Sequence, residues 1–363
     1  MFQTMKRLHI KSVTESILIA GMMTLLPLVA MAQHVVEGSS YYLPRTALRF
    51  TLLVERTSTQ PGELGLYADR FLKKNDVATE ATTSYRILTI KMTSVGVADT
   101  SKLFTPAIDA KHSISSIKVD EQSGILLAVN AEPKKVDAPA PFIAAEKPLP
   151  LNPRDYMSQE ILAAGSSAKM AELIAQEIYD IRESKSQLNK GQADFMPKDG
   201  EQMRIMLNNL NTQEAALLQM FEGITERDTV ETVITFIPEK IVNKEVIFRF
   251  SKKFGLLESD DLSGEPYYIS IADLHKQAQN TAIAENGKKS KDDAGIYANL
   301  PGKIKATLFH NEKMIMECEL YAAQYGITAP MDNELFGKKL LTSLVYDGVT
   351  GHVETIKTEI LKK

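Results

Sequence analysis

The stretch EPKKVDAPAPFIAAEKPLPLNP, residues 132–153, divides the chain into parts of different character. It holds six prolines, a density that removes backbone hydrogen-bond donors and favours extended conformations. We therefore expect neither a helix nor a strand in this stretch. Apolar and polar residues alternate before it, whereas a helical period begins after it. The stretch predicts a linker between a β-rich domain at residues 33–131 and a helical segment at residues 154–225.

Before the linker, apolar residues recur at every second position, which is typical of half-buried strands. This alternation predicts strands within residues 48–54 and 88–92. Residues 117–129 predict a β-hairpin, because the polar residues 120–124 interrupt an apolar run and end in a glycine. A short helix is expected at residues 64–72, where apolar residues are spaced by three and four positions.

After the linker, apolar residues form one helical face over residues 170–188, and Gly191 suits the end of that helix. A second helix is expected after Asp199, which has capping-box spacing with Gln202. The asparagine-rich residues 208–211 are poor helix formers and predict a break in this second helix. The segment is therefore expected to contain two to three helices.

Glu214 is a carboxylate whose role depends on that break. If a third helix starts at Asn211, Glu214 completes a capping box three residues later. If the helix is continuous, Glu214 lies in an apolar stripe and needs a basic partner, for which Arg182 and Arg204 are the candidates. We favour the capping box, because it needs no partner from another segment.

Strand-like alternation returns in the last third of the chain and completes the predicted architecture. A turn with an acid, polar residues and a glycine occurs at residues 347–351 and resembles the one at residues 120–124. The match indicates either a duplicated β module or ordinary turn chemistry. We predict an α+β, β-rich fold in which two antiparallel β modules bracket the helices, the second module at residues 226–363. Its strands are expected within residues 230–236, 246–250, 304–308 and 314–318.

Residues 1–32 have the three parts of a secretory signal peptide. Basic residues precede an apolar run at residues 17–30, and Ala-Met-Ala at residues 30–32 forms a small-x-small cleavage site. A glycine and a proline interrupt the apolar run, which is short for a bilayer span. We expect cleavage after Ala32, export without a membrane span, and residence in the periplasm, with secretion or the cell surface as alternatives.

The composition argues against several classes of function. The formal net charge is −4, and a mildly acidic chain without a basic stripe lacks the electrostatic footprint of a nucleic-acid-binding protein. The single cysteine, Cys318, lies in an apolar alternation, so we expect a buried, inert thiol and no intrachain disulfide. The histidines show no metal-binding spacing, and there is no glycine-rich phosphate loop, so neither a metal nor a cofactor is expected.

One local pattern resembles a catalytic motif. Ser166 and Lys169 have the S-x-x-K spacing of penicillin-recognising enzymes. The partner motifs S-D-N and K-T-G are absent from the sequence. We therefore expect Ser166 to cap a helix rather than to act as a nucleophile.

The densest acidic cluster, residues 258–265, supplies the candidate binding surface. Asp260 and Asp261 within it are potential calcium ligands, although their spacing matches no EF-hand loop, and a solvated turn is the simpler expectation. Tyr267 and Tyr268 follow directly. The candidate surface therefore consists of Tyr267, Tyr268, Asp260 and Asp261.

Several short motifs occur in order along the mature chain, and together they resemble one family. The chain is similar to the exported proteins of Bacteroidota grouped as domain of unknown function 4831. That name carries no activity; the resemblance implies export into a Gram-negative envelope and one recurring architecture, and it transfers no site residues. The motifs are YLPRT at residues 42–46, IYDIRES at 178–184, PKDG at 197–200, Glu214 with FEG at 221–223, FRFS at 248–251 and GEPYY at 264–268.

Three classes of function fit these observations. The leading hypothesis is a periplasmic structural or binding protein whose partner is a protein or a glycan of the cell envelope. The main alternative is an envelope hydrolase with carboxylates from separate loops, chosen among Asp199, Asp260, Asp261 and Glu265. A third class is an adhesin-like module that presents the tyrosine pairs at residues 41–42 and 267–268.

Overall fold

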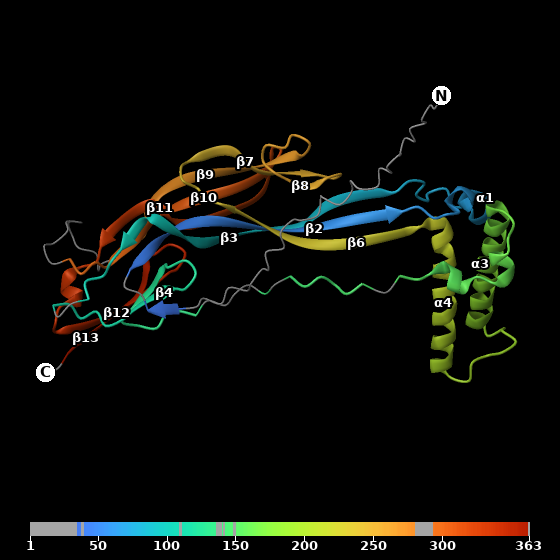
Figure 1. Ribbon diagram of the computed structural model, residues 1–363, viewed down its shortest axis with the longest axis horizontal. Coiled ribbons are helices and arrows are strands. Elements are labelled where there is room, and N and C mark those ends of the chain that lie inside the picture. The colour runs from blue at the N-terminus through green and yellow to red at the C-terminus, as the bar shows by residue number, and fades with distance from the viewer. Residues whose placement is uncertain are drawn as a thin grey trace, which may run out of the picture.

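The chain forms a long molecule with β-sheets at one end and helices at the other (Figure 1). This α+β, β-rich architecture confirms the predicted fold class. The predicted signal peptide lies outside the described residues. Within the described part of the chain, no helix is long and apolar enough to cross a membrane. The computed structural model describes residues 35–37, 40–108, 111–135, 140, 142–147, 150–279 and 293–361.

A long three-stranded ribbon connects the two ends of the molecule (Figure 1). β2 (Tyr41–Gln60) pairs antiparallel with β3 (Thr82–Phe104) on one side and with β6 (Ile224–Phe236) on the other. β2 has 20 residues, which at about 3.3 Å per residue span roughly 66 Å. The strand-like alternation at residues 48–54 and 88–92 correctly predicted parts of this ribbon.

A five-stranded antiparallel sheet packs against the ribbon with the order β11-β10-β9-β7-β8. Alternate residues of β2, such as Leu48, Phe50 and Leu52, are fully buried against Ile269 and Leu308 of this sheet. The apolar alternation that marks these strands in the sequence therefore faces one shared core. The strands are β7 (Val242–Ser251), β8 (Gly255–Leu257), β9 (Glu265–Gln277), β10 (Tyr297–His310) and β11 (Lys313–Pro330).

A second five-stranded sheet, with the order β1-β4-β5-β12-β13, closes the β end of the molecule. β4 and β5 form the predicted hairpin, and β5 also pairs with β12. Because isolated two-stranded hairpins are marginal in water, each hairpin gains stability from the other. The two predicted β modules, residues 33–131 and 226–363, are therefore parts of one packed body. The strands are β1 (Val35–Glu37), β4 (Ile117–Asp120), β5 (Leu126–Val129), β12 (Leu340–Tyr346) and β13 (Val353–Ile360).

The β body contains one arrangement twice: a long hairpin followed along the chain by a short one. β2 and β3 precede β4 and β5, as β10 and β11 precede β12 and β13. Both long hairpins have the same irregularity in strand pairing, in which one residue of the first strand lies opposite four residues of the second strand. Leu43 stands opposite residues 99–102, and Pro301 stands opposite residues 323–326. The two halves thus share a backbone irregularity as well as an order of strands.

The turns of the two short hairpins are alike in detail. Asp120 accepts hydrogen bonds from the backbone N–H and hydroxyl of Ser123, and Asp347 accepts the same two bonds from Thr350. Each turn ends in a glycine in the left-handed region, with φ of 68° at Gly124 and 72° at Gly351. This agreement exceeds what shared turn composition requires and favours the duplicated β module predicted as one of two alternatives.

The helical end is built around a pair of long helices (Figure 1). Their caps follow the predicted local chemistry, since Ser166 and Asp199 accept hydrogen bonds from backbone N–H groups and Gly191 ends a helix with φ of 70°. The short helix expected at residues 64–72 packs into the same core. The elements are η1 (Gly65–Tyr67), α1 (Ala68–Leu72), η2 (Pro153–Tyr156), α2 (Gln159–Leu162), α3 (Ser167–Lys190) and α4 (Gly200–Glu222).

The predicted break at residues 208–211 is wrong, because α4 is continuous. The predicted capping box of Glu214 is wrong as well. Nε of Arg182 donates to Oε1 of Glu214 at 2.6 Å, and Nζ of Lys185 binds the other carboxylate oxygen. The apolar contacts and these ion pairs between α3 and α4 outweigh the weak helix propensity of the asparagines. Of the two proposed partners, Arg182 was correct, whereas Arg204 pairs with Glu201.

Replacing Glu214 with glutamine is expected to lower the free energy of unfolding by about 1 to 2 kcal/mol at neutral pH, because α4 then loses its partly buried ion pairs with Arg182 and Lys185 of α3. Burial tends to raise the pKa of Glu214, but hydrogen bonds from Lys185 and Arg182 outweigh it and hold the pKa below the usual value. The advantage of the wild type is therefore expected above the pH where an unfolded glutamate titrates, and it disappears as the pH falls below that range.

Urea unfolding of the two proteins across a pH series measures this difference. Glu201→Gln is the matched control, because Glu201 pairs with Arg204 in the same way on the exposed surface of α4. No measurable loss is expected from the control. Equal midpoints for Glu214→Gln and the wild type at neutral pH would contradict the prediction.

The described residues of the predicted linker, 132–135, 140, 142–147 and 150–152, form a strap along the ribbon. The described residues between 132 and 152 contain neither a helix nor a strand, as predicted, and η2 begins at Pro153. The strap runs beside β6 toward the helical end (Figure 1). Nζ of Lys147 forms an ion pair with Asp228 of β6, which Arg56 of β2 also binds at 2.7 Å. The strap and the ribbon therefore join the two ends of the molecule side by side.

Candidate functional site

The structure does not present Tyr267 on a surface. Its side chain is only 8% exposed, and its ring stacks between those of Phe248 at 4.5 Å and His310 at 4.3 Å. Burial raises the pKa of Tyr267. Tyr268 is half-buried and, as the next residue of the same strand, points to the other face of the sheet. The two tyrosines of the candidate surface thus do not form one exposed pair.

Asp260 and Asp261 lie in the exposed connection between β8 and β9. Asp261 accepts hydrogen bonds from the backbone N–H of Ser263 at 2.9 Å and from its hydroxyl at 2.6 Å, and these bonds lower the pKa of Asp261. Nε of Arg249 donates to the carbonyl of Ser259 at 2.9 Å in the same connection. Among the described residues, no group of three or more metal-ligating side chains gathers to hold an ion. The cluster has the geometry of a solvated turn.

The acids proposed for a hydrolase are distributed over two ends of the molecule. Asp199 caps α4 at the helical end, where its carboxylate accepts the N–H of Gln202 at 2.8 Å. Asp260, Asp261 and Glu265 belong to the β body (Figure 1), and Glu265 pairs with Nε2 of His310 at 2.8 Å. Asp199 therefore does not share a cleft with the other three.

The other tyrosine pair contributes to the core. Tyr41 is fully buried, and its hydroxyl donates to the carbonyl of Gly295 at 2.9 Å and accepts from the N–H of Tyr297 at 2.8 Å. Burial raises the pKa of Tyr41 far above its usual value. Tyr42 is half-buried and donates its N–H to the carbonyl of Gly124 at 2.9 Å. Tyr41 thus fixes β2 to the start of β10 and is not a contact surface.

Cys318 is half-buried on β11. Burial raises the pKa of its thiol, and the neighbouring charge of Glu317 adds to the effect. A raised pKa lowers the fraction of thiolate, so the thiol has little nucleophilic character at neutral pH.

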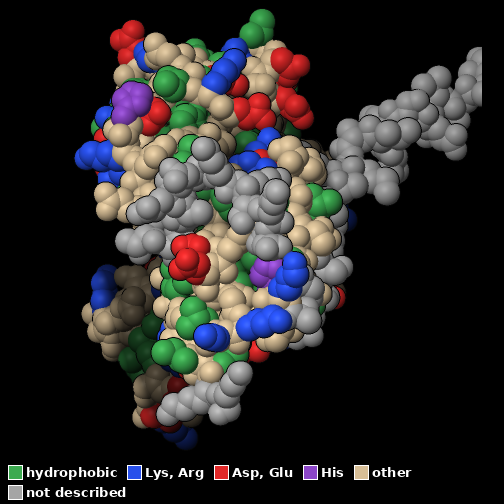
Figure 2. All heavy atoms as spheres, turned by 90° about the vertical axis from the view of Figure 1, so that its left-hand side faces the viewer, with side chains coloured by type: hydrophobic (Ala, Val, Ile, Leu, Met, Phe, Trp, Pro, Cys, Tyr) green, Lys and Arg blue, Asp and Glu red, His purple; other side chains and the backbone are tan. Residues whose placement is uncertain are grey.

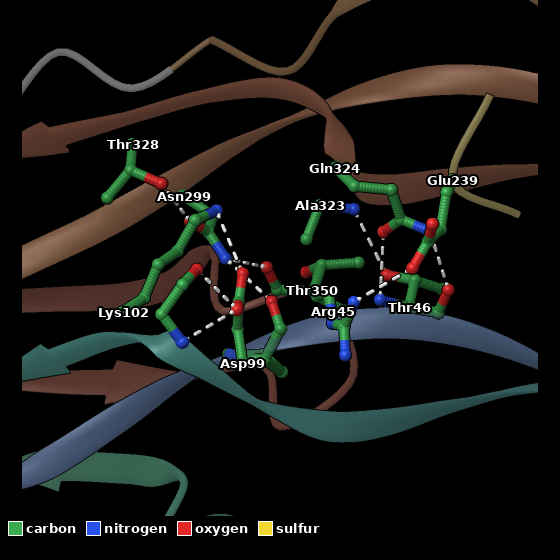
Figure 3. A network of polar contacts seen from close by, with 12 residues as sticks. Arg45, Thr46, Asp99, Lys102, Glu239, Asn299, Ala323, Gln324, Thr328 and Thr350 are labelled. Carbon is green, nitrogen blue, oxygen red and sulfur yellow. Dashed lines mark hydrogen bonds and ion pairs between the residues drawn. The ribbon is translucent and has the colours of Figure 1, made fainter. Parts of the chain in front are cut away.

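A buried polar network lies where the ribbon, the β10–β11 hairpin and the second turn meet (Figure 3). At its centre, Asn299 is fully buried. Its Nδ2 donates to the carbonyl of Pro44 at 3.1 Å and to that of Thr350 at 2.9 Å, and its Oδ1 accepts the hydroxyl of Thr328 at 2.7 Å. One amide thus joins β2, β11 and the turn after β12.

The network continues through Gln324 and Thr46 (Figure 3). The Gln324 amide accepts the N–H of Thr46 at 3.0 Å and donates back to its carbonyl at 2.8 Å. The Thr46 hydroxyl donates to the carbonyl of Val349 at 3.1 Å and accepts the N–H of Ala323 at 3.1 Å. These side chains satisfy backbone groups of β2, of the turn after β12 and of the β11 irregularity at Ala323. The geometry is that of a structural junction.

An apolar groove lies at the free end of the helical pair, with a cavity volume of about 350 Å³. Phe195, in the connection between α3 and α4, is 86% exposed beside it, whereas Leu188 at the bottom of the groove is only 4% exposed. Apolar residues gathered on an exposed surface in this way mark interaction sites. The adjacent Phe195 and Met196 in an otherwise polar connection were the available sequence signal. The groove is lined by Ser184, Gln187, Leu188, Ala193, Phe195, Met206, Asn209 and Leu210.

Together these features describe an elongated α+β protein with a duplicated β body and a projecting helical pair. Among known protein families, residues 37–354 match the one described as "Domain of unknown function (DUF4831)". The chain belongs to this family, as its sequence motifs indicated. Comparisons with curated proteins and with solved structures gave no match.

Proposed function

We propose that this chain is an exported structural or binding protein of the periplasm that holds a partner protein at the free end of its helical pair. The observation that carries the proposal is the apolar groove between α3 and α4, with Phe195 exposed beside it. Export rests on the signal-peptide pattern at residues 1–32.

The arrangement of the molecule supports a role in which the helical end meets a partner at a distance from the β body. The ribbon separates the free end of the helical pair, where the groove lies, from the sheets of the β end (Figure 1). The ion pairs of Glu214 with Arg182 and Lys185 hold α3 against α4 on the side of the groove that is nearer the ribbon. A fixed pair of helices is a suitable platform, because a preformed groove loses little conformational entropy when a partner binds.

The lining of the groove favours a protein over a glycan at this end. Leu188, Met206 and Leu210 form apolar walls, and Met206 brings the adaptable thioether that recurs at binding surfaces for apolar side chains. An amphipathic helix or loop that inserts apolar residues matches this chemistry. Ser184, Gln187 and Asn209 also line the groove and can form hydrogen bonds, but more of the lining is apolar than polar, which suits apolar side chains better than a sugar ring.

Site-specific photo-crosslinking in intact cells tests the proposal. A photoreactive phenylalanine analogue at position 195 is expected to give a covalent adduct with one envelope protein. The same analogue at Phe254 is the matched control, because Phe254 is also exposed, at 54%, but lies in the β body. Met206→Glu is expected to reduce the adduct at position 195 at least about tenfold, since it places a charge in the groove. No adduct at position 195, or the same adduct at position 254, would overturn the proposal.

A further inference from the structure

A second cavity, with a volume of about 300 Å³, lies beside the turn between β12 and β13. It belongs to the β end of the molecule, away from the helical groove (Figure 1). Tyr321 of β11 and Asp347 of the turn line it, together with His352 and Glu354 at the start of β13. The cavity is therefore bordered by hydrogen-bonding side chains from β11, from the turn between β12 and β13 and from the start of β13.

Comparison with the first half of the duplicated body shows that the fold does not require the polar residues at two of these positions. When the two turns are aligned in sequence at Asp120 and Asp347, His352 corresponds to Ile125 and Glu354 corresponds to Leu127. Ile125 and Leu127 are each only 3% exposed. The same backbone arrangement thus accepts two apolar residues in one copy and carries a histidine and a glutamate beside a cavity in the other.

Both carboxylates at the cavity already have partners within the protein. Asp347 accepts hydrogen bonds from Val349 and Thr350 within its own turn. Both oxygens of Glu354 accept from Nζ of Lys134, at 3.1 and 3.2 Å. Both basic and acidic side chains are exposed on this end of the molecule (Figure 2). Because Glu354 is already paired with a lysine and the oxygens of Asp347 are engaged within the turn, a neutral ligand suits the cavity better than an ionic one.

The remaining groups suit a ligand with several hydroxyls. A carboxylate that is held by one lysine still has lone pairs that accept hydroxyl hydrogens. Nδ1 of His352 is buried and has no hydrogen-bond partner among the described residues, so the imidazole beside the cavity has unused hydrogen-bonding capacity. The Tyr321 ring is 42% exposed and offers an apolar face beside these groups.

We propose that this cavity binds a neutral polyhydroxylated ligand, namely one sugar ring. His352 and Glu354 bond its hydroxyls, and Tyr321 packs against its apolar face. The volume of about 300 Å³ lies at the lower end of the range for ligand pockets, which favours a single ring over a chain. This site is separate from the proposed protein-binding groove and does not depend on it.

Saturation-transfer NMR with glucose, galactose, mannose and N-acetylglucosamine, each added singly to the whole protein, tests the proposal. At least one sugar is expected to receive magnetisation from the wild type. The double variant His352→Ile, Glu354→Leu gives the second half the residues of the first and is expected to abolish the signal. Tyr321→Ala, at an exposed position of β11, is expected to weaken the affinity at least about tenfold even if the double variant folds poorly.

The double variant His310→Ile, Glu265→Leu is the matched control, because it removes a histidine and a glutamate that pair at the end of β9 and β10 remote from the cavity. It is expected to keep the sugar signal. The absence of transfer to all four sugars, or wild-type affinity in both the Tyr321→Ala and the His352→Ile, Glu354→Leu variants, would overturn the proposal. These readouts do not involve Phe195, so they succeed or fail independently of the crosslinking experiment.

Discussion

Replacing Asn299 with alanine is expected to lower the free energy of unfolding by about 3 to 5 kcal/mol. The Asn299 side chain is fully buried and is the donor for the carbonyls of Pro44 and Thr350. Alanine leaves both buried carbonyls without these hydrogen bonds, and each loss costs about 1 to 3 kcal/mol. The hydroxyl of Thr328 loses its acceptor as well.

Equilibrium unfolding in urea measures the loss, and Thr328→Val is the matched control. The control removes one hydrogen bond from the same amide and leaves the two carbonyls satisfied, so we expect it to cost about 1 kcal/mol. If the network is a structural junction, Asn299→Ala costs clearly more than Thr328→Val. Equal losses for the two variants would show that the amide of Asn299 does not hold the three elements together.

The elements that the sequence predicted correctly are those with local causes. The alternation at residues 48–54 follows from one buried and one exposed face of β2. The helix ends at Ser166, Gly191 and Asp199 follow from side chains and backbone angles within a single turn. Each of these signals lies within a few residues of the feature that it predicts, so no knowledge of distant contacts was needed.

The features that escaped prediction depend on contacts between distant segments. The continuity of α4 through residues 208–211 is supported by α3, and the Lys185 partner of Glu214 comes from that helix. The pairing of β5 with β12 joins residues more than two hundred positions apart in the sequence. Alternation fixes which face of a strand is buried, but it does not identify the strand that pairs with it.

The candidate site shows the same difference between features with local causes and features that depend on distant segments. Tyr267 was chosen for its residue type, but the positions of Phe248 and His310, which come from other strands, place it in a stack. Phe195 stands out only when the structure shows that the end of the helical pair is uncovered. His352 and Glu354 stand out as polar only when they are compared with the apolar residues of the first copy of the module. That comparison depends on the backbone arrangement that the two halves share, which only the structure shows.

Replacing Gly223 with alanine is expected to be nearly as damaging as the loss of Asn299, at about 3 kcal/mol or more. Gly223 ends α4 and begins the connection to β6, with φ of 76° and ψ of −161°. This backbone conformation is essentially restricted to glycine. A Cβ atom at this position would also lie 1.9 Å from the carbonyl oxygen of Gln60, so the end of β2 and the end of α4 would have to separate.

Gly191→Ala is the control that separates these two effects, because Gly191 also ends a long helix with a positive φ, of 70°. Its conformation is the ordinary left-handed one, and a Cβ there meets no atom within 4 Å. We therefore expect the control to cost only about 1 to 2 kcal/mol, the usual penalty for an L-residue in that conformation. Urea midpoints of the two variants measure the difference. Of these two glycines, only Gly223 is packed closely against Gln60. A larger loss at Gly223 would therefore show that close backbone packing fixes the helical end to the ribbon. Equal losses would show that Gly223 acts only as an ordinary helix cap.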